Sequence, residues 1–120
     1  MSVATARLGK AGERRVQRFL ETKGYDIREI NFRTRRGEVD IIGVYGSTVV
    51  FVEVKTWRHV PIEGLEHAVD RRKARRILQT ARVYLQSHPE FVEYEVRFDV
   101  VFFDGSRLTH IPNAFGESGV

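Results

Sequence analysis

The sequence contains no cysteine, and no apolar run in it approaches the roughly 20 residues that a membrane span needs. The lack of cysteine excludes disulfide bonds, zinc–thiolate sites and thiol catalysis, and it fits a reducing compartment. Residues 1–15 lack the apolar segment of a signal peptide. We therefore expect a cytoplasmic protein in which residues 1–120 form a single domain, large enough to bury a core without cross-links.

Positive charge exceeds negative charge, with 20 Lys and Arg against 16 Asp and Glu and a pI of about 9.8. A surplus of +4 indicates only that polyanions are plausible partners. The cations gather in two places, a turn before Gly37 and a later helix. Each group can be a solvated surface, or together they can contact phosphates. The residues that can bind nucleic acid are Arg33, Arg35 and Arg36 in the turn, and Arg71, Arg72, Lys73, Arg75 and Arg76 in the helix.

Residues 37–55, GEVDIIGVYGSTVVFVEVK, predict a β-hairpin because most of them are β-branched. Gly46-Ser47 suits a two-residue type II′ turn. Pairing from that turn would place Asp40 opposite Glu53 and Glu38 opposite Lys55. Two carboxylates roughly 5 Å apart on one face destabilise a sheet. We expect compensation from Lys55, from a divalent cation, or from both.

The rest of the chain predicts two helices and three further strands. A helix over residues 5–23 carries Glu13 at the rim of its apolar face, and Asp70 is the expected N-cap of a helix over 71–87. Asp99 interrupts an apolar strand and needs a partner, for which Arg97 is the candidate. The expected strands are residues 25–32, a strand within 91–103 and residues 107–111, with a loop over 56–64 and a loose tail over 112–120.

This arrangement could support phosphodiester hydrolysis. A Mg²⁺ or Mn²⁺ ion held by Asp40 and Glu53, with the Val54 carbonyl as a further ligand, would polarise a phosphate and activate water. Lys55 would stabilise the charge of the transition state or orient the water, and Glu13 could complete the metal's surroundings. The alternative is a Glu38–Lys55 salt bridge with Asp40 and Glu53 both solvated.

The order of the sequence motifs resembles that of the PD-(D/E)XK nuclease superfamily. The residues within the motifs resemble those of its YraN-like branch, which is related to archaeal Holliday junction resolvases. The resemblance extends over nearly the whole chain, although Trp57 stands where members often have arginine. It implies a restriction endonuclease-like α/β fold, a mixed sheet of about five strands flanked by helices in the order α-β-β-β-α-β-β. The motifs are GKAGE at 9–13, GEVD at 37–40, VEVK at 52–55, A-V-x-x-x-K at 68–73, RFDVV at 97–101 and NAF at 113–115.

The resemblance assigns Asp40, Glu53 and Lys55 to the nuclease motif and Glu13 to the helix glutamate of the resolvases. It also implies the machinery of a Mg²⁺- or Mn²⁺-dependent endonuclease more firmly than any particular substrate. We expect DNA in preference to RNA, with branched or repair intermediates as candidate substrates. A resolvase-like enzyme would need a two-fold dimer to cut two strands symmetrically. Two rival hypotheses are a non-catalytic nucleic-acid-binding module on the same fold and an interaction protein in which the acidic residues serve only sheet pairing.

Overall fold

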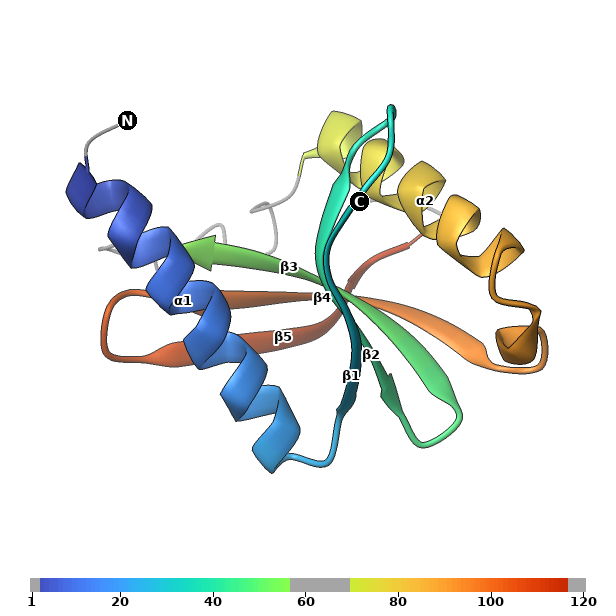
Figure 1. Cartoon of the computed structure of the whole chain (residues 1–120), viewed down its shortest axis with the longest axis horizontal. Coiled ribbons are helices and arrows are strands. Elements are labelled where there is room, and N and C mark those ends of the chain that lie inside the picture. Colours follow the sequence, from blue (N-terminus) through green and yellow to red (C-terminus); the bar gives the residue numbers. More distant parts are fainter. Residues whose placement is uncertain (1–2, 57–69, 117–120) are drawn as a thin grey trace.

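The chain folds into a five-stranded sheet with one helix on each face, as the computed structural model shows for residues 3–56 and 70–116 (Figure 1). This confirms the predicted α/β class and the predicted order of elements. In the part of the chain that the structure describes, neither helix is long and apolar enough to cross a lipid bilayer. The elements are α1 Val3–Thr22, β1 Asp26–Arg33, β2 Glu38–Tyr45, β3 Thr48–Thr56, α2 Arg71–Gln86, β4 Glu95–Phe103 and β5 Leu108–Phe115, with a 3₁₀ turn η2 at Pro89–Phe91.

The strands lie in the order β1-β2-β3-β4-β5. Only β3 and β4 run parallel, and the other neighbours are antiparallel. A parallel pair needs a long crossover, and the segment between β3 and β4 contains α2. The sheet is therefore mixed, as predicted, because one crossover separates two antiparallel parts.

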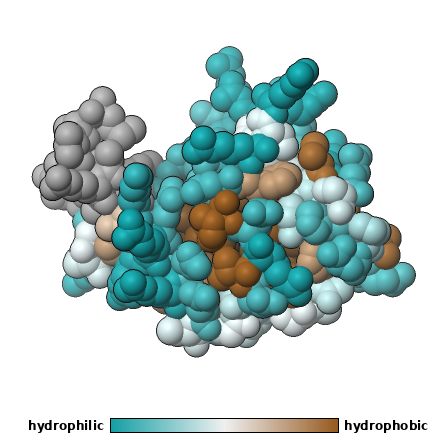
Figure 2. All heavy atoms as spheres, viewed as in Figure 1, coloured by the Kyte–Doolittle hydropathy of each residue, from teal (hydrophilic) through white to brown (hydrophobic). Residues whose placement is uncertain are grey.

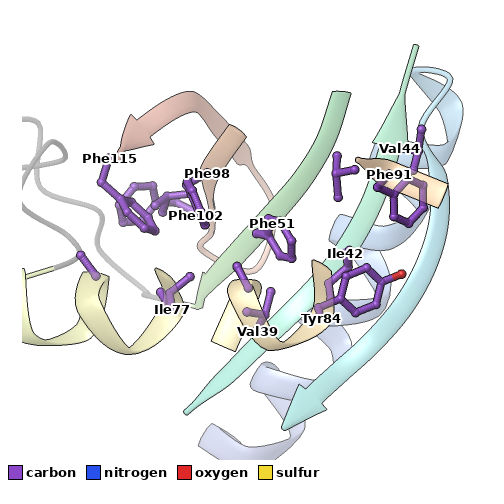
Figure 3. Packing of buried hydrophobic residues seen from close by; sticks show 14 residues of the cluster. Val39, Ile42, Val44, Phe51, Ile77, Tyr84, Phe91, Phe98, Phe102 and Phe115 are labelled. Carbon is purple, nitrogen blue, oxygen red and sulfur yellow. The ribbon is translucent and has the colours of Figure 1, made fainter. Parts of the chain in front are cut away.

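The core has two sides because successive side chains of a strand point to opposite faces. Phe51 packs on the α2 side with Tyr84 and Phe98 (Figure 3). On the α1 side, Val52 packs with Val16 and other apolar residues. The α2 helix begins at the predicted cap, since the Asp70 carboxylate accepts the Lys73 N–H at 2.8 Å. Both sheet faces are thus covered, which leaves the strand ends as places for exposed chemistry.

The hairpin turn forms as predicted, but the pairing behind it stops early. Gly46 has φ +61°, and Ser47 has no positive φ, as a type II′ turn requires. The register runs from Tyr45 opposite Thr48 to Ile41 opposite Val52. Continued pairing to Glu38 and Lys55 was predicted and is wrong. Like charges directly opposite each other disfavour pairing, and the two strands part where the carboxylates begin.

The last strand is longer than predicted. The expectation of a loose tail from Pro112 is wrong as far as Phe115, because β5 continues to that residue and buries its ring against Phe98. The strand passes Pro112 through an irregularity in its pairing with β4, with Asn113 at φ +53°. Thr56, predicted to begin the loop, instead ends β3. Residues 57–69, which include Trp57 and the rest of the predicted loop, lie outside the described residues, as do 117–120.

Candidate active site

A cavity of about 220 Å³ opens between α2 and the ends of β2 and β3, where those strands part. It contains both carboxylates of the predicted site and two cations of α2. The side chains that line it come from three separate stretches of sequence, so the fold brings together residues more than 30 positions apart. They are Gly37, Glu38, Asp40, Glu53, Lys73, Arg76 and Ile77.

Asp40 lies in an environment that penalises its charge. Its carboxylate accepts the backbone N–H of Val54 at 2.8 Å, so a side chain of β2 meets the backbone of β3 where the strand pairing has ended. Burial, followed by the negative charge of Glu53, raises the pKa of Asp40 to about 7, although the Val54 hydrogen bond opposes this rise. The repulsion that the sequence predicted between these two carboxylates is therefore present.

Glu53 is the most buried charged residue that lines the cavity, with 5% of its surface exposed. Its Oε1 atom lies 2.7 Å from the Lys73 ammonium and 3.8 Å from the Lys55 ammonium. Burial and the neighbouring Lys73 lower the pKa of Lys55. Burial opposes the charge of Lys73 as well, but its hydrogen bond to Glu53 and the negative charges of Glu53 and Asp40 together outweigh burial and raise the pKa of Lys73. Asp40, Glu53 and Lys55 thus converge as predicted, and Lys73 joins them.

Glu13 approaches the site from α1, on the other side of the sheet. The close packing of Gly12 brings this part of the helix near the end of β3, because a Cβ at Gly12 would collide with the Thr56 side chain. Glu13 is partly buried, and its charge adds to the forces that raise the pKa of Asp40. Within the described residues, no three Asp, Glu or His side chains are grouped to hold a metal ion. Glu13 is therefore a neighbour of the two carboxylates rather than part of a ready three-carboxylate centre.

The donor atoms of the site suit a hard divalent cation. Asp40 and Glu53 present oxygens to one cavity, and a cation between them would offset the repulsion that raises the pKa of Asp40. In an extended strand the N–H and C=O of one residue point to the same side, so the Val54 carbonyl faces β2 as its N–H does. Asp40, Glu53 and the Val54 carbonyl are the groups that would hold Mg²⁺ or Mn²⁺.

The structure contradicts the alternative in which Glu38 pairs with Lys55. Glu38 instead lies opposite Arg33 in the β1–β2 ladder, with 3.1 Å between Arg33 Nε and Glu38 Oε2. Glu53 is buried, which is incompatible with a solvated side chain. The Arg33 side chain remains 73% exposed despite this ion pair. The two carboxylates therefore need an explanation other than the salt bridge.

The two cationic groups of the sequence meet beside the cavity. The turn between β1 and β2 packs on α2, since the hydroxyl oxygens of Thr34 and Thr80 lie 3.4 Å apart. A Cβ at Gly37 would lie only 3.1 Å from Arg76 Cβ, so glycine permits this close approach. Figures 1 and 2 show the turn beside the start of α2, with hydrophilic side chains projecting from both. Of the predicted nucleic-acid-binding residues, Lys73 and Arg76 line the cavity. Lys73 is partly buried, and the exposed ones are Arg33, Arg35, Arg36, Arg71, Arg72, Arg75 and Arg76.

Asp99 forms a separate network on the α1 side of the sheet. Arg97 binds both of its carboxylate oxygens at 2.9 Å, which confirms the predicted ion pair. His110 Nε2 lies 2.7 Å from Asp99 Oδ2, and the Asn113 N–H donates to Oδ1 at 2.9 Å. Arg97 also donates to the Tyr25 hydroxyl at 2.6 Å. Asp99 therefore joins β4 to β5 and, through Arg97, to the residue that precedes β1.

Comparison with known proteins places the chain in a family. The family model described as "Uncharacterised protein family UPF0102" matches residues 12–103. This chain belongs to the UPF0102 family. The matched region contains Glu13, Asp40, Glu53, Lys55 and Lys73, which are the residues that the structure gathers at the cavity or beside it.

Several members of the family align along most of their length. The UPF0102 protein YraN of Escherichia coli O8 (strain IAI1) is 40% identical over 116 residues, which cover 96% of this chain and 88% of that protein. The relative from Syntrophomonas wolfei is 44% identical over 112 residues, 90% and 96% of the two chains. The relative from Nitrobacter winogradskyi is 38% identical over 119 residues, 98% and 99% of the two chains. The similarity to YraN that the motifs indicated is therefore confirmed.

Asp40→Asn should stabilise this UPF0102 protein above neutral pH. Because the folded-state pKa of Asp40 is about 7 rather than 3.8, the native state binds the extra proton and the free energy of unfolding falls as pH rises between these values. An amide keeps the acceptor for the Val54 N–H and carries no charge. We expect a gain of about 2 kcal/mol at pH 8 and almost none at pH 4, measured by urea unfolding without metal. Equal stability of the two proteins at pH 8 would contradict the proposed cost of this charge.

Proposed function

We propose that this UPF0102 protein is a divalent-metal-dependent endonuclease that hydrolyses DNA phosphodiester bonds. One observation carries the proposal: Asp40 and Glu53 line one cavity with Lys73 and Arg76, and the Lys55 ammonium lies 3.8 Å from Glu53. Two acids and a lysine at the end of a β-hairpin are the parts that the PD-(D/E)XK resemblance implies. The proposal assigns the chain to that superfamily and Mg²⁺ or Mn²⁺ to Asp40, Glu53 and the Val54 carbonyl.

The residues of the site have distinct roles in this proposal. When bound, a divalent cation supplies a Lewis acid for the phosphate and lowers the pKa of water. Asp40 and Glu53 bind and orient that cation. Lys55, held near Glu53 in a largely buried position, donates hydrogen bonds to the oxygen that gains charge in the transition state. Glu13 contributes negative charge next to Asp40 and orders the solvent around the site.

The cationic surface around the cavity supports the proposal that the substrate is a polyanion. Lys73 and Arg76 line the cavity, while exposed arginines from the β1–β2 turn and from the start of α2 flank it. A guanidinium group can bind two phosphate oxygens at once, and such contacts fix the position of a nucleic acid without reading its sequence. We favour DNA over RNA because the resemblance includes Holliday junction resolvases. Branched or repair intermediates and a two-fold dimer are part of the same proposal.

Cleavage assays with a panel of nucleic acids test this proposal directly. Linear duplex, single-stranded, flapped and four-way-junction DNA, together with structured RNA, would be incubated with Mn²⁺ or Mg²⁺ and with EDTA as the control. We expect metal-dependent cleavage of DNA that disappears in Asp40→Ala, while the variant still binds DNA. A protein that binds DNA but cleaves none of these substrates in either metal would refute the proposal.

A non-catalytic nucleic-acid-binding module is the second candidate, and one observation favours it. Lys73 already neutralises Glu53 at 2.7 Å, so the buried carboxylate has a partner without any metal. This candidate predicts salt-sensitive binding with no cleavage. It also predicts that Asp40→Ala binds DNA equally or more tightly, since the substitution removes negative charge beside the phosphate-binding groups.

A further inference from the structure

Two ammonium groups lie close to the Glu53 carboxylate, and they differ in how readily they could move away from it. The Lys73 ammonium lies 2.7 Å from Glu53 Oε1 and its side chain is 42% exposed, whereas Lys55 lies 3.8 Å from the same oxygen and is 18% exposed. The closer cation is therefore also the one that can swing into solvent. Lys55 is both farther from Glu53 and less exposed.

The charges of the site favour this exchange. Asp40 and Glu53 carry two negative charges when ionised, and Lys55 and Lys73 carry two positive charges. A divalent cation placed between the carboxylates would add two charges to a site that is already neutral. A cation bound to Glu53 and the Lys73 ammonium would repel each other at short range. Lys55 already places another positive charge 3.8 Å from the same carboxylate oxygen, so departure of the more exposed Lys73 would relieve the repulsion.

Lys73 also occupies a position that a helix disfavours for a cation. Asp70 caps α2, so Lys73 is the third residue of the first turn, where the N-terminal end of the helix dipole is positive. A glutamate commonly stands there and completes the cap. The first turn of α2 contains no acidic residue. The pairing with Glu53 supplies a physical reason for a lysine at this position.

We propose that Lys73 holds Glu53 as an internal counter-ion and that a divalent cation must displace it to bind. This inference rests on the proposed function, because it takes Asp40 and Glu53 as metal ligands. The displaced ammonium stays on the same helix face as Arg76, three residues further on, and that face lines the cavity. Lys73 is then available for a phosphate oxygen of the substrate, so the metal and the phosphate are bound in a coupled manner.

Metal affinity measured without any nucleic acid tests the displacement. Titration calorimetry would compare Mn²⁺ binding to the wild-type protein, Lys73→Met and Lys73→Arg in 150 mM salt. We expect Lys73→Met to bind Mn²⁺ roughly ten-fold more tightly, because a competing charge-assisted hydrogen bond is gone. Lys73→Arg keeps a competing cation and should resemble the wild type. Lys23→Met, which removes an exposed charge just after the end of α1, should change the dissociation constant by less than about two-fold.

The outcomes separate the inference from the proposed function. Equal or weaker Mn²⁺ binding by Lys73→Met, with a normal circular dichroism spectrum, would overturn the inference and leave the proposed function standing. The absence of Mn²⁺ binding in both the wild type and Lys73→Met would overturn the metal site itself. If Lys73→Met proves unstable, its thermal midpoint with and without Mn²⁺ gives a second measurement. The midpoint should rise more in the variant than in the wild type, because binding to the native state alone stabilises it, and an equal rise would count against the displacement.

Discussion

Replacing Lys55 by methionine is expected to lower the cleavage rate by about 10²- to 10³-fold. In the proposed mechanism the Lys55 ammonium stabilises charge that develops on the phosphate. Methionine has a similar length and no charge, so the shape of the site is kept. Single-turnover kinetics on the best substrate of the panel would measure the chemical step without contributions from product release.

The fold and the metal site should survive this substitution. Burial lowers the pKa of Lys55, which means that the folded state carries its charge at a cost, and an apolar side chain removes that cost. We expect a thermal midpoint within a few degrees of the wild-type value and Mn²⁺ binding that persists. Lys10→Met, which changes an exposed lysine of α1, is the matched control and should cleave normally. Undiminished cleavage by Lys55→Met would remove Lys55 from the mechanism.

The sequence was sufficient to predict the features that depend on neighbouring residues. The α2 cap at Asp70, the hairpin turn at Gly46 and the pair between Arg97 and Asp99 involve groups within a few positions of each other. The convergence of Asp40, Glu53 and Lys55 also follows from local rules, because the turn fixes the register of the hairpin. Near these residues the actual geometry departs from the ideal hairpin, yet the side chains still share a site.

Two features of the site depended on information that local patterns lack. The parting of β2 and β3 coincides with the repulsion between two carboxylates and with the hydrogen bond that Asp40 accepts from the Val54 N–H. The ion pair between Lys73 and Glu53 depends on how α2 packs across the sheet, and Lys73 lies 17 positions after Thr56, the end of β3. The spacing A-V-x-x-x-K marked Lys73 as a position of interest, but only the packed helix shows which acid it meets.

The Asp99 network shows the same limit for the last strand. A proline at position 112 indicated an end to regular structure, because proline cannot donate to a strand ladder. Asp99 instead accepts the Asn113 N–H, so a side chain of β4 bonds the backbone of β5 beyond the proline. The strand can therefore continue to Phe115, whose ring packs on Phe98. The hydrogen bond to the buried Asp99 carboxylate thus accounts for a β5 strand that ends later than backbone preferences alone predicted.

Asp99→Asn should destabilise the fold far more than Lys55→Met does. Asp99 is fully buried and receives hydrogen bonds from Arg97, His110 and the Asn113 backbone. The amide cannot neutralise Arg97, and removal of one partner from a buried ion pair costs about 3–5 kcal/mol. For a domain of this size we expect the thermal midpoint to fall by roughly 10–20 °C at pH 7, measured by calorimetry or circular dichroism.

The destabilisation caused by Asp99→Asn should decrease at acidic pH, and a second Arg–Asp pair in the same sheet offers a matched control. Burial alone would raise the pKa of Asp99, but the hydrogen bonds from His110, Arg97 and Asn113 hold that pKa below its usual value. The carboxylate therefore stabilises the fold at pH values above about 4, which is its pKa in the unfolded state. This stabilisation is lost as pH falls through the lower pKa of the folded state. Asp26 forms the same Arg–Asp pair two residues apart, with Arg28 at 2.8 Å, but both side chains are exposed. Asp26→Asn should cost less than about 1 kcal/mol, so equal losses in the two variants would show that burial does not set the strength of the Asp99 network.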